Sequence, residues 1–398
     1  MVGPSRCTGD VLTTEQGERL VELRRDFHRH PEIAHQEHRT ATVIAERLRS
    51  LGLDEVRTGV GQTGVVGVLR GGRAGRTVLL RADMDALPLL EVDRGQPYRS
   101  TNASVHHACG HDGHVAILLT VAELLSAQRS TLPGTVSFVF QPAEERVGGA
   151  EGMISDGALD PRPDACFGLH LWNELEVGRV DTRPGPIYAS ADAFDISLSG
   201  SGGHGAMPHQ VADPVVAAAE LIVALQTLVS RETPPLEPAA LTIGSIHGGT
   251  APNIIPARVE LQGTLRAFDP SVRERLLTRL REIVLGIAGT FRVEPEIRVT
   301  DCCPACINDE AMTAIVQRVA SEVVGSDQVS TLTRTTGADD MSMFLQEVPG
   351  CYFFVGSANA QRGLASPHHS PTFDFDERAL EIGVSVLSRV ALAFLESE

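Results

Sequence analysis

Apolar residues in the first half of the chain recur in two alternating periods. Within residues 14–51 they follow helical spacing, with an interruption at His30 and Pro31 and a stop at Gly52. Beyond Gly52, short apolar runs of strand length alternate with helical runs. The predicted strands are residues 64–69, 77–82, 135–140 and 165–170, and the predicted helices are residues 115–125 and 149–155.

This order of elements predicts an α/β fold, in which a mostly parallel sheet has helices on both faces. In such sheets, ligands bind outside the carboxyl ends of the strands. Three of the predicted strand ends carry side chains that can do chemistry: Asp83 with Asp85, Glu144 with Glu145, and His170. We therefore expect the functional site along this edge of the sheet.

The pattern changes near residue 186, after a segment rich in Pro and Gly. The strands and helices that follow have the order β-α-β-β-α-β, which is typical of a ferredoxin-like α+β unit. They are predicted at residues 194–198, 214–229, 241–246, 259–265, 272–287 and 292–299. The alternation of strand and helix patterns seen in the first part of the chain resumes at Asp301 and ends in a helix over residues 377–394. We expect a larger domain at residues 1–186 and 300–398, with the ferredoxin-like domain inserted at 187–299.

Composition restricts the partners and the location of the protein. The formal net charge is −17 over 398 residues, and this argues against nucleic acid or an anionic membrane, since either favours a basic face. No run of 18 apolar residues and no apolar signal-peptide core occurs. Seven cysteines spread over a long chain make a poor disulfide framework. The sequence therefore predicts a cytoplasmic protein.

Three of the cysteines are close together, at Cys302, Cys303 and Cys306. The last two form a CxxC motif, which can be redox-active or bind a metal. There is no second CxxC, and the segment lies at the predicted domain junction. We interpret these cysteines as incidental buried thiols.

The densest group of potential metal ligands is residues 106–114, with the sequence HHACGHDGH. Thiolate and imidazole are ligands that zinc and similar ions prefer. A lone histidine before a helix is more often part of a solvated turn. Four histidines and a cysteine within nine positions favour metal binding.

Acidic pairs follow two of the predicted strands. Adjacent carboxylates such as Glu144 and Glu145 are usually solvated, but here one could hold a metal while the other moves protons. Asp83 and Asp85 could orient ligand imidazoles, or they could cap a helix.

Further imidazoles occur at His170 and at the downstream pair His368 and His369. Together with the acidic pairs and the 106–114 cluster, they exceed the needs of one tetrahedral site. They favour a hydrolytic centre of two metal ions, roughly 3.5–4 Å apart.

Five segments resemble the amidohydrolase branch of the dinuclear metallopeptidases, which includes aminoacylases, hippurate hydrolases, indole-acetyl-amino-acid hydrolases and N-acetyl-diaminopimelate deacetylases. The segments are residues 81–88 (RADMDALP), 107–114 (HACGHDGH), 141–145 (QPAEE), 202–209 (GGHGAMPH) and 247–256 (HGGTAPNIIP). The resemblance covers nearly the whole chain, from residues 24–32 (RRDFHRHPE) to residues 373–377 (FDFDE).

The resemblance implies a metal-dependent hydrolase that splits the amide bond of N-acyl amino acids into a carboxylic acid and an amino acid. It implies two divalent ions per subunit, with Zn²⁺ expected first and Mn²⁺, Co²⁺ or Ni²⁺ as alternatives. Glu144 would be the general base that acts on a metal-bridging water, and Asp85 would support the ligands. The implied ligands are Cys109, His111, Glu145, His170 and His369. His369 is preferred to His368 because the family's ligand directly precedes a Ser-Pro pair.

For the inserted domain, the resemblance implies a lid that also forms a dimer. His204 would reach the partner subunit's site and polarise the scissile carbonyl, and Asn253 would lie near the substrate. Arg266 could bind a substrate carboxylate through its guanidinium, or it could be a charge on the strand surface. We therefore expect a homodimer or a dimer-based homo-oligomer.

Three other functions compete with this interpretation. A dipeptidase or carboxypeptidase could use the same dinuclear mechanism on a different acyl side. A binding protein that has lost catalysis is disfavoured, because Glu144 and every implied ligand are present. A serine hydrolase would need the Gly-x-Ser-x-Gly motif, which does not occur.

Overall fold

The structure, a computed structural model, describes residues 11–146 and 148–397. The chain forms two compact units. Among the described residues, the larger unit contains those before Pro186, the segment Ile307–Thr333 and those from Asp340 onward. The smaller unit contains Pro186–Cys306 and Arg334–Asp339.

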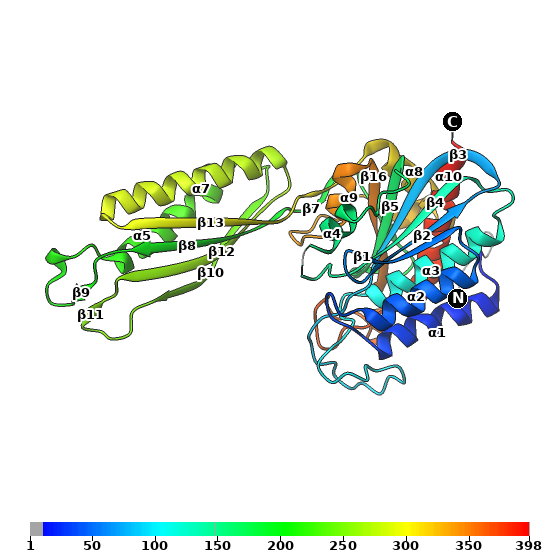
Figure 1. Cartoon of the computed structure of the whole chain (residues 1–398), viewed down its shortest axis with the longest axis horizontal. Helices are drawn as coiled ribbons and strands as arrows, with labels where there is room; N and C mark the ends of the chain where they lie inside the picture. Colours follow the sequence, from blue (N-terminus) through cyan, green and yellow to red (C-terminus); the bar gives the residue numbers. More distant parts are fainter. Residues whose placement is uncertain (1–10, 147, 398) are drawn as a thin grey trace. The chain divides into compact units, whose positions relative to one another are not determined.

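Eight strands form one sheet in the larger unit, in the order β1-β2-β4-β3-β5-β16-β6-β15 (Figure 1). The central strands β4, β3, β5 and β16 are parallel, whereas β1 and β2 are antiparallel additions at one edge. The strands are β1 (Glu55–Val60), β2 (Gly64–Arg70), β3 (Arg73–Asp83), β4 (Pro133–Gln141), β5 (Ala165–Glu176), β6 (Val180–Asp181), β15 (Val329–Ser330) and β16 (Gly350–Ala358).

Helices lie on both faces of this sheet, and β3 shows why. Val78, Leu80 and Ala82 point into the core that includes α3 and α10, whereas Arg81 points the other way and bonds to Asp340 at the start of α9. One layer consists of α1 (Thr14–Arg29), α2 (His38–Ser50), α3 (His111–Ala127), α8 (Glu310–Val324) and α10 (Arg378–Glu396). On the other face, α4 (Gly149–Ser155) packs against α9 (Met341–Glu347).

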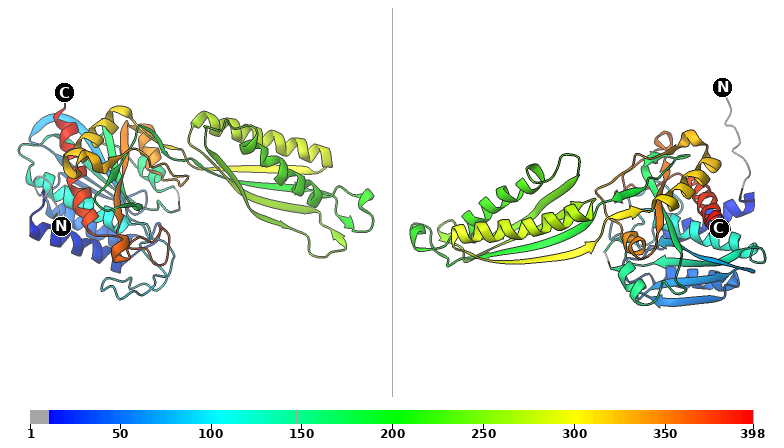
Figure 2. Two further views of the ribbon diagram at one scale, coloured as in Figure 1. Left: turned by 180° about the vertical axis from the view of Figure 1, so that it is seen from behind. Right: turned by 90° about the horizontal axis from the view of Figure 1, so that it is seen from above.

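The smaller unit is an antiparallel four-stranded sheet with the order β10-β12-β8-β13. Two helices, α5 and α7, lie side by side over the same face of this sheet (Figure 2). Buried and exposed residues alternate along β12, as expected for a sheet that is covered on one face. The main elements are β8 (Ala191–Ser199), α5 (Pro214–Leu225), α6 (Thr227–Ser230), β10 (Ala239–Gly248), β12 (Arg258–Ala267), α7 (Pro270–Phe291) and β13 (Glu294–Cys303).

Short elements complete the chain. The smaller unit also has the paired strands β9 (Gly203–His204) and β11 (Ile254–Ile255). The 3₁₀ turn η1 (Pro208–Gln210) contacts β9. Strands β7 (Gly185–Tyr188) and β14 (Cys306–Asn308) lie where the chain passes between the units. The 3₁₀ turns η2 (Ser326–Gln328) and η3 (Ala360–Arg362) belong to the larger unit.

The α/β fold with an inserted ferredoxin-like unit is confirmed. One detail of the prediction is wrong, because β5 continues to Glu176 and His170 lies within it. The strand continues because residues beyond His170 still pair with β16, as Leu171 does with Val355. His170 nevertheless lies near the carboxyl edge of β3, since Arg81 pairs with Gly168.

Candidate metal centre

The candidate site lies in the larger unit, where the ends of β3 and β4 meet the start of α3. Strands β3 and β4 are parallel neighbours in which Asp83 pairs with Gln141, so the segments that follow them begin at the same edge. Gly110 precedes α3 with a φ of 92°, a left-handed conformation that favours glycine. This turn places Cys109 and His111 at the same edge.

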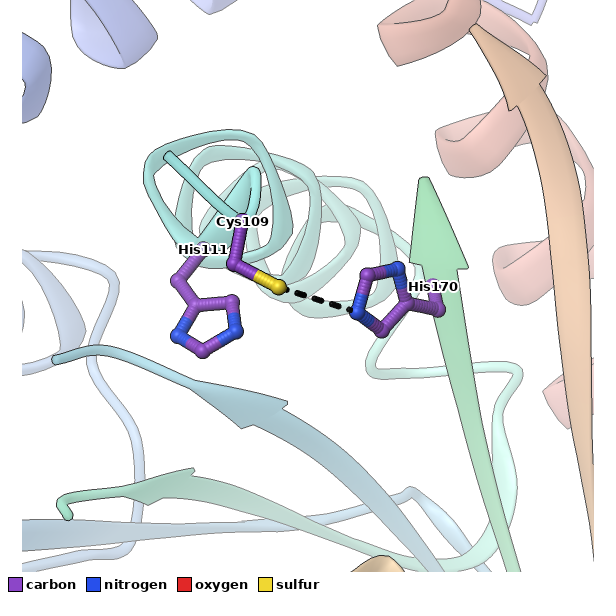
Figure 3. A group of neighbouring side chains, drawn as sticks. All are labelled: Cys109, His111 and His170. Carbon is purple, nitrogen blue, oxygen red and sulfur yellow. Dashed lines mark hydrogen bonds between the residues drawn. The ribbon is translucent and has the colours of Figure 1, made fainter. Parts of the chain in front are cut away.

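Cys109, just before α3, faces His170 in β5. Its Sγ lies 3.6 Å from Nε2 of His170 (Figure 3). The other ring nitrogen, Nδ1, lies 2.7 Å from the carbonyl oxygen of Leu171, which can only accept, so Nδ1 carries the hydrogen. Burial and the nearby His114 and His368 hold the pKa of His170 well below its usual range. The ring is therefore neutral, and the lone pair on Nε2 is directed toward the thiol.

His111 has the same hydrogen-bonding pattern. Its Nδ1 donates to the carbonyl oxygen of Asp85 at 2.9 Å, which leaves Nε2 to face Glu145 Oε1 at 3.9 Å. Both facing atoms are buried and lack a hydrogen-bond partner among the described residues. Burial lowers the pKa of His111, but the charge of Asp83, the hydrogen bond to Asp85 and the charge of Glu145 outweigh it and raise the pKa to about 10. The surroundings of this ring therefore stabilise positive charge.

The segment that carries Glu144 and Glu145 is held by two other carboxylates. The Asp85 carboxylate accepts hydrogen bonds from the backbone N–H groups of Glu144 and Glu145, each at 3.1 Å. Glu37 accepts from the N–H of Ala143 at 2.9 Å, and Ala143 has a φ of 54°. A non-glycine residue in this region is strained and is often found at functional sites. The two glutamates are thus fixed through their backbone at this edge of the sheet.

The structure distinguishes the two downstream histidines. Nε2 of His368 accepts a hydrogen bond from the N–H of Asn173 at 3.1 Å, and its ring stacks on Trp172. By contrast, Nε2 of His369 lies 3.3 Å from Glu145 Oε1. The His369 side chain is 55% exposed. Of the two, only His369 directs a ring nitrogen toward the acidic pair.

His114 is close to the site, but both of its ring nitrogens are engaged. The N–H of Leu171 donates to its Nε2 at 2.9 Å, so the hydrogen is on Nδ1 and is donated to Asp83 at 2.6 Å. Asp83 also accepts from Arg81 at 2.8 Å. His114 and Asp83 therefore position this edge of the site, and both ring nitrogens of His114 are engaged.

These donors suit divalent metal ions. Three sets of donor atoms each lie within 4.8 Å of one another: Cys109 with His111 and His170, Cys109 with Glu145 and His369, and His111 with Glu144 and Glu145. The sets overlap at Cys109, His111 and Glu145, as expected where two ions share a site. Thiolate, imidazole and carboxylate are ligands of zinc and related ions. His111 Nε2 and Glu145 Oε1 lack a hydrogen-bond partner among the described residues, although His369 Nε2 lies 3.3 Å from Oε1, and these are the atoms that an ion would satisfy.

In the smaller unit, the structure brings together two of the three expected residues. His204 pairs with Ile254 across the β9–β11 ladder, and the N–H of Gly205 donates to the carbonyl oxygen of Asn253 at 2.8 Å. Arg266 lies near the opposite end of the sheet, because Leu265 pairs with Asp192 at the start of β8. Its Nη1 is buried and has no hydrogen-bond partner in the described part of the chain.

The CxxC cysteines are not exposed to solvent. Cys303 and Cys306 are 1% and 0% exposed, which agrees with their interpretation as buried thiols. The side chain of Cys302 lies outside those that the structure describes.

Sequence reasoning did not predict the part played by Glu37. Its carboxylate accepts from Thr63 at 2.6 Å and from the backbone of Ala143, and so connects the start of α2 to the end of β4. Burial is the largest effect on its pKa, which is raised. A glutamate within an amphipathic stretch carries no sequence signal for such a contact.

A parallel α/β sheet with thiol, imidazole and carboxylate donors along its carboxyl edge is the architecture of a metal-dependent hydrolase. Comparison with known proteins agrees. The profile described as Peptidase family M20/M25/M40 matches residues 79–393, and the chain belongs to this family.

Three relatives illustrate what the chain is similar to. Thermostable carboxypeptidase 2 of Saccharolobus solfataricus is 40% identical over 382 residues, which cover 94% of this chain and 95% of that protein. N-acetyl-L-cysteine deacetylase of Bacillus subtilis is 37% identical over 388 residues, 95% and 91% of the two chains. The structure of a dinuclear metal-binding peptidase of the M20 family from Bacillus subtilis superposes with a TM-score of 0.85 and 30% identity. The match covers 97% of this chain and 100% of that one.

The chain is therefore an enzyme of the M20 hydrolase family, and the family and its dinuclear member support divalent metal binding. In the described residues, no helix is both long and apolar enough to span a membrane.

Proposed function

We propose that this enzyme hydrolyses the amide bond of N-acyl amino acids with two divalent metal ions, Zn²⁺ first among them. The observation that carries the proposal is the convergence of Cys109, His111, Glu145, His170 and His369 on one edge of the sheet beside Glu144. The deacetylase among the relatives acts on an N-acyl amino acid by its name, and this supports the same substrate class here.

Each residue has a distinct role in this proposal. The five ligands would hold two divalent ions, and such ions supply Lewis-acid polarisation of a carbonyl and a water of lowered pKa. Glu144 would take a proton from the attacking water as the water oxygen bonds to the carbonyl carbon, and would pass that proton to the amide nitrogen as the C–N bond breaks. The products are a carboxylic acid and a free amino acid. Asp85 acts through Glu144 and Glu145, whose backbone it holds, and is a positioning residue.

The inserted unit would supply the groups that recognise the substrate. The N–H of Ala206 donates to Nδ1 of His204 at 3.0 Å, so the neutral ring carries its hydrogen on Nε2 and can donate to a carbonyl oxygen. Asn253 lies beside it, and the unpartnered nitrogen of Arg266 would suit a substrate carboxylate. We propose that His204 acts in the partner subunit's site of a homodimer. A cytoplasmic location belongs to the same proposal.

A carboxypeptidase or dipeptidase is the second candidate. The chain is 40% identical to a thermostable carboxypeptidase, and this identity favours the second candidate. Both reactions would need the same metal centre and base. The two functions differ only in whether the acyl group is itself an amino acid.

A substrate panel tests both candidates. Purified enzyme loaded with Zn²⁺ would be given N-acetyl, N-benzoyl and N-indolylacetyl amino acids beside a set of dipeptides and N-blocked dipeptides, and the released amine would be measured. We expect kcat/KM to be highest for simple N-acyl amino acids. Higher values for the peptides would establish the second candidate, and no release from any substrate would refute both.

A further inference from the structure

A second cluster of metal-ligating side chains lies in the larger unit and shares no residue with the centre described above. It consists of His28 in α1, Glu91 in the segment after β3, and His106 before α3. These residues are 0%, 4% and 0% exposed, and their ligand atoms lie within 4.8 Å of one another. The proposed hydrolytic function has no use for this cluster.

His106 is the unexplained member. It is fully buried, yet neither of its ring nitrogens has a hydrogen-bond partner among the described residues. Its Nε2 lies 3.7 Å from Glu91 Oε1, which is beyond hydrogen-bond distance. Burial, followed by the charge of His28, lowers the pKa of His106 to about 4, so the ring is neutral at pH 7 and keeps a lone pair. Native proteins nearly always satisfy such buried polar atoms, with protein, water or an ion.

The distances lie within about 0.2 Å of those expected around a tetrahedral ion. Ligand atoms bound at about 2.0–2.2 Å from zinc lie roughly 3.3–3.6 Å from each other. Nε2 of His28 lies 3.1 Å from Glu91 Oε1, and Nε2 of His106 lies 3.7 Å from the same oxygen. Zinc is often bound by two imidazoles and one carboxylate, with a fourth position left open.

The surroundings of His28 also match those of a metal ligand. Its Nδ1 lies 2.7 Å from Asp112 Oδ2, and Arg24 holds the same oxygen at 2.8 Å. Ligand histidines commonly donate their second nitrogen to a carboxylate in this way, which directs Nε2 toward the ion. Here Nε2 donates a hydrogen bond to Glu91 Oε1 at 3.1 Å, and it would release this proton on binding an ion.

Glu91 provides both negative charge and access. Burial raises its pKa, but hydrogen bonds from His28, Ser100 and Gln96 outweigh this and lower the pKa to about 2, so it is a carboxylate at pH 7. It also lines a surface cleft of about 340 Å³, through which an ion could reach the cluster.

We propose that His28, Glu91 and His106 bind a further divalent ion of the zinc class. This ion would connect α1 to the segment that leads into Cys109. The inference does not depend on the proposed function. The competing explanation is a buried water that bridges His106 and Glu91.

Metal stoichiometry separates an ion from a water. Metal-free enzyme would be incubated with Zn²⁺, desalted, and analysed for zinc per chain by mass spectrometry. We expect three equivalents for the natural sequence and two for His106→Leu, which removes the ring and both unpartnered nitrogens. The control is His38→Leu, an exposed histidine of the same unit, which should keep three.

A second comparison makes the result independent of the hydrolytic centre. In a Cys109→Ala background, adding His106→Leu should remove one further equivalent, whatever the first substitution removes. If His106→Leu does not fold, Glu91→Gln serves instead, because it keeps a similar shape and hydrogen-bonding capacity. Equal zinc content with and without the His106 or Glu91 substitution, in correctly folded protein, would overturn the proposal in favour of the water.

Discussion

The carboxylate of Asp85 accepts a hydrogen bond from the backbone N–H of Glu145 at 3.1 Å. Its other oxygen accepts from the N–H of Glu144, and the carbonyl oxygen of Asp85 accepts from His111. One residue at the end of β3 therefore positions an imidazole and two carboxylates that come from other parts of the chain. The carbonyl oxygen accepts the hydrogen bond of His111 Nδ1 at 2.9 Å, and Oδ1 of the carboxylate lies 3.5 Å from the same nitrogen.

Replacing Asp85 with asparagine tests this arrangement. An amide has one acceptor oxygen, so its NH₂ group would face one of the two N–H donors and displace the glutamate segment. We expect metal affinity or kcat to fall about 10–100-fold. Metal titration and steady-state kinetics measure the two effects. Asp156→Asn is the matched control, because Asp156 also accepts a backbone N–H, from Gly61, but on an exposed side chain.

Replacing Glu144 with glutamine removes the proposed base and keeps the shape of the side chain. The protein should retain its metal but lose about 10²–10⁴ in kcat, which is the usual contribution of a general base. Elemental analysis and kinetics on the same preparation test both parts. Glu151→Gln, an exposed substitution on α4, should behave like the natural enzyme. A Glu144→Gln enzyme with normal turnover would remove Glu144 from the mechanism.

Metal removal should expose the thiol of Cys109. A metal-bound cysteine is a thiolate that the ion protects from alkylation, so chelation should abolish activity and allow iodoacetamide to label Cys109. Cys166 and Cys351 are internal controls, because both are fully buried. Burial raises the pKa of both thiols, that of Cys351 to about 11, so they should stay unlabelled. Equal labelling of Cys109 with and without metal would show that it is not a ligand.

Alanine substitutions should separate His368 from His369. His369→Ala removes a proposed ligand and should weaken binding of one metal ion at least about 10-fold. His368→Ala removes a ring that stacks on Trp172 and accepts from Asn173, so it should lower the melting temperature but leave both ions bound. Zinc content and thermal unfolding of the two variants give the comparison. The reverse pattern would assign the ligand to His368.

Mixed dimers test the role of His204. Glu144→Gln and His204→Ala should each be inactive, since removing one oxyanion donor typically costs about 10²–10³ in rate. After subunit exchange, about half of all dimers would be mixed, and each mixed dimer would have one complete site. Activity should then recover to roughly a quarter of that of the natural enzyme. No recovery despite verified exchange would mean that His204 does not act in a partner's site.

Much of the fold could be predicted because its signals are local. The change from helical to alternating periodicity located the elements of both units, and their order indicated the parallel sheet and the inserted ferredoxin-like unit. Strand ends were less certain. The continuation of β5 past His170 depends on pairing with β16, in which Val355 lies 184 residues beyond its partner Leu171.

The sequence by itself also determined which chemistry is present, because ligand atom types and the spacing of residues 106–114 are properties of the chain alone. Only the tertiary structure decided which imidazoles are available. From the sequence alone, His111 and His114 are equally good candidate ligands. In the fold, Leu171 and Asp83 occupy both nitrogens of His114. Asn173 occupies Nε2 of His368 from 195 residues away, while Nδ1 of the same ring lies 3.8 Å from Cys109 Sγ. A ring nitrogen is available only if no distant group bonds to it, and those partners are brought near by folding.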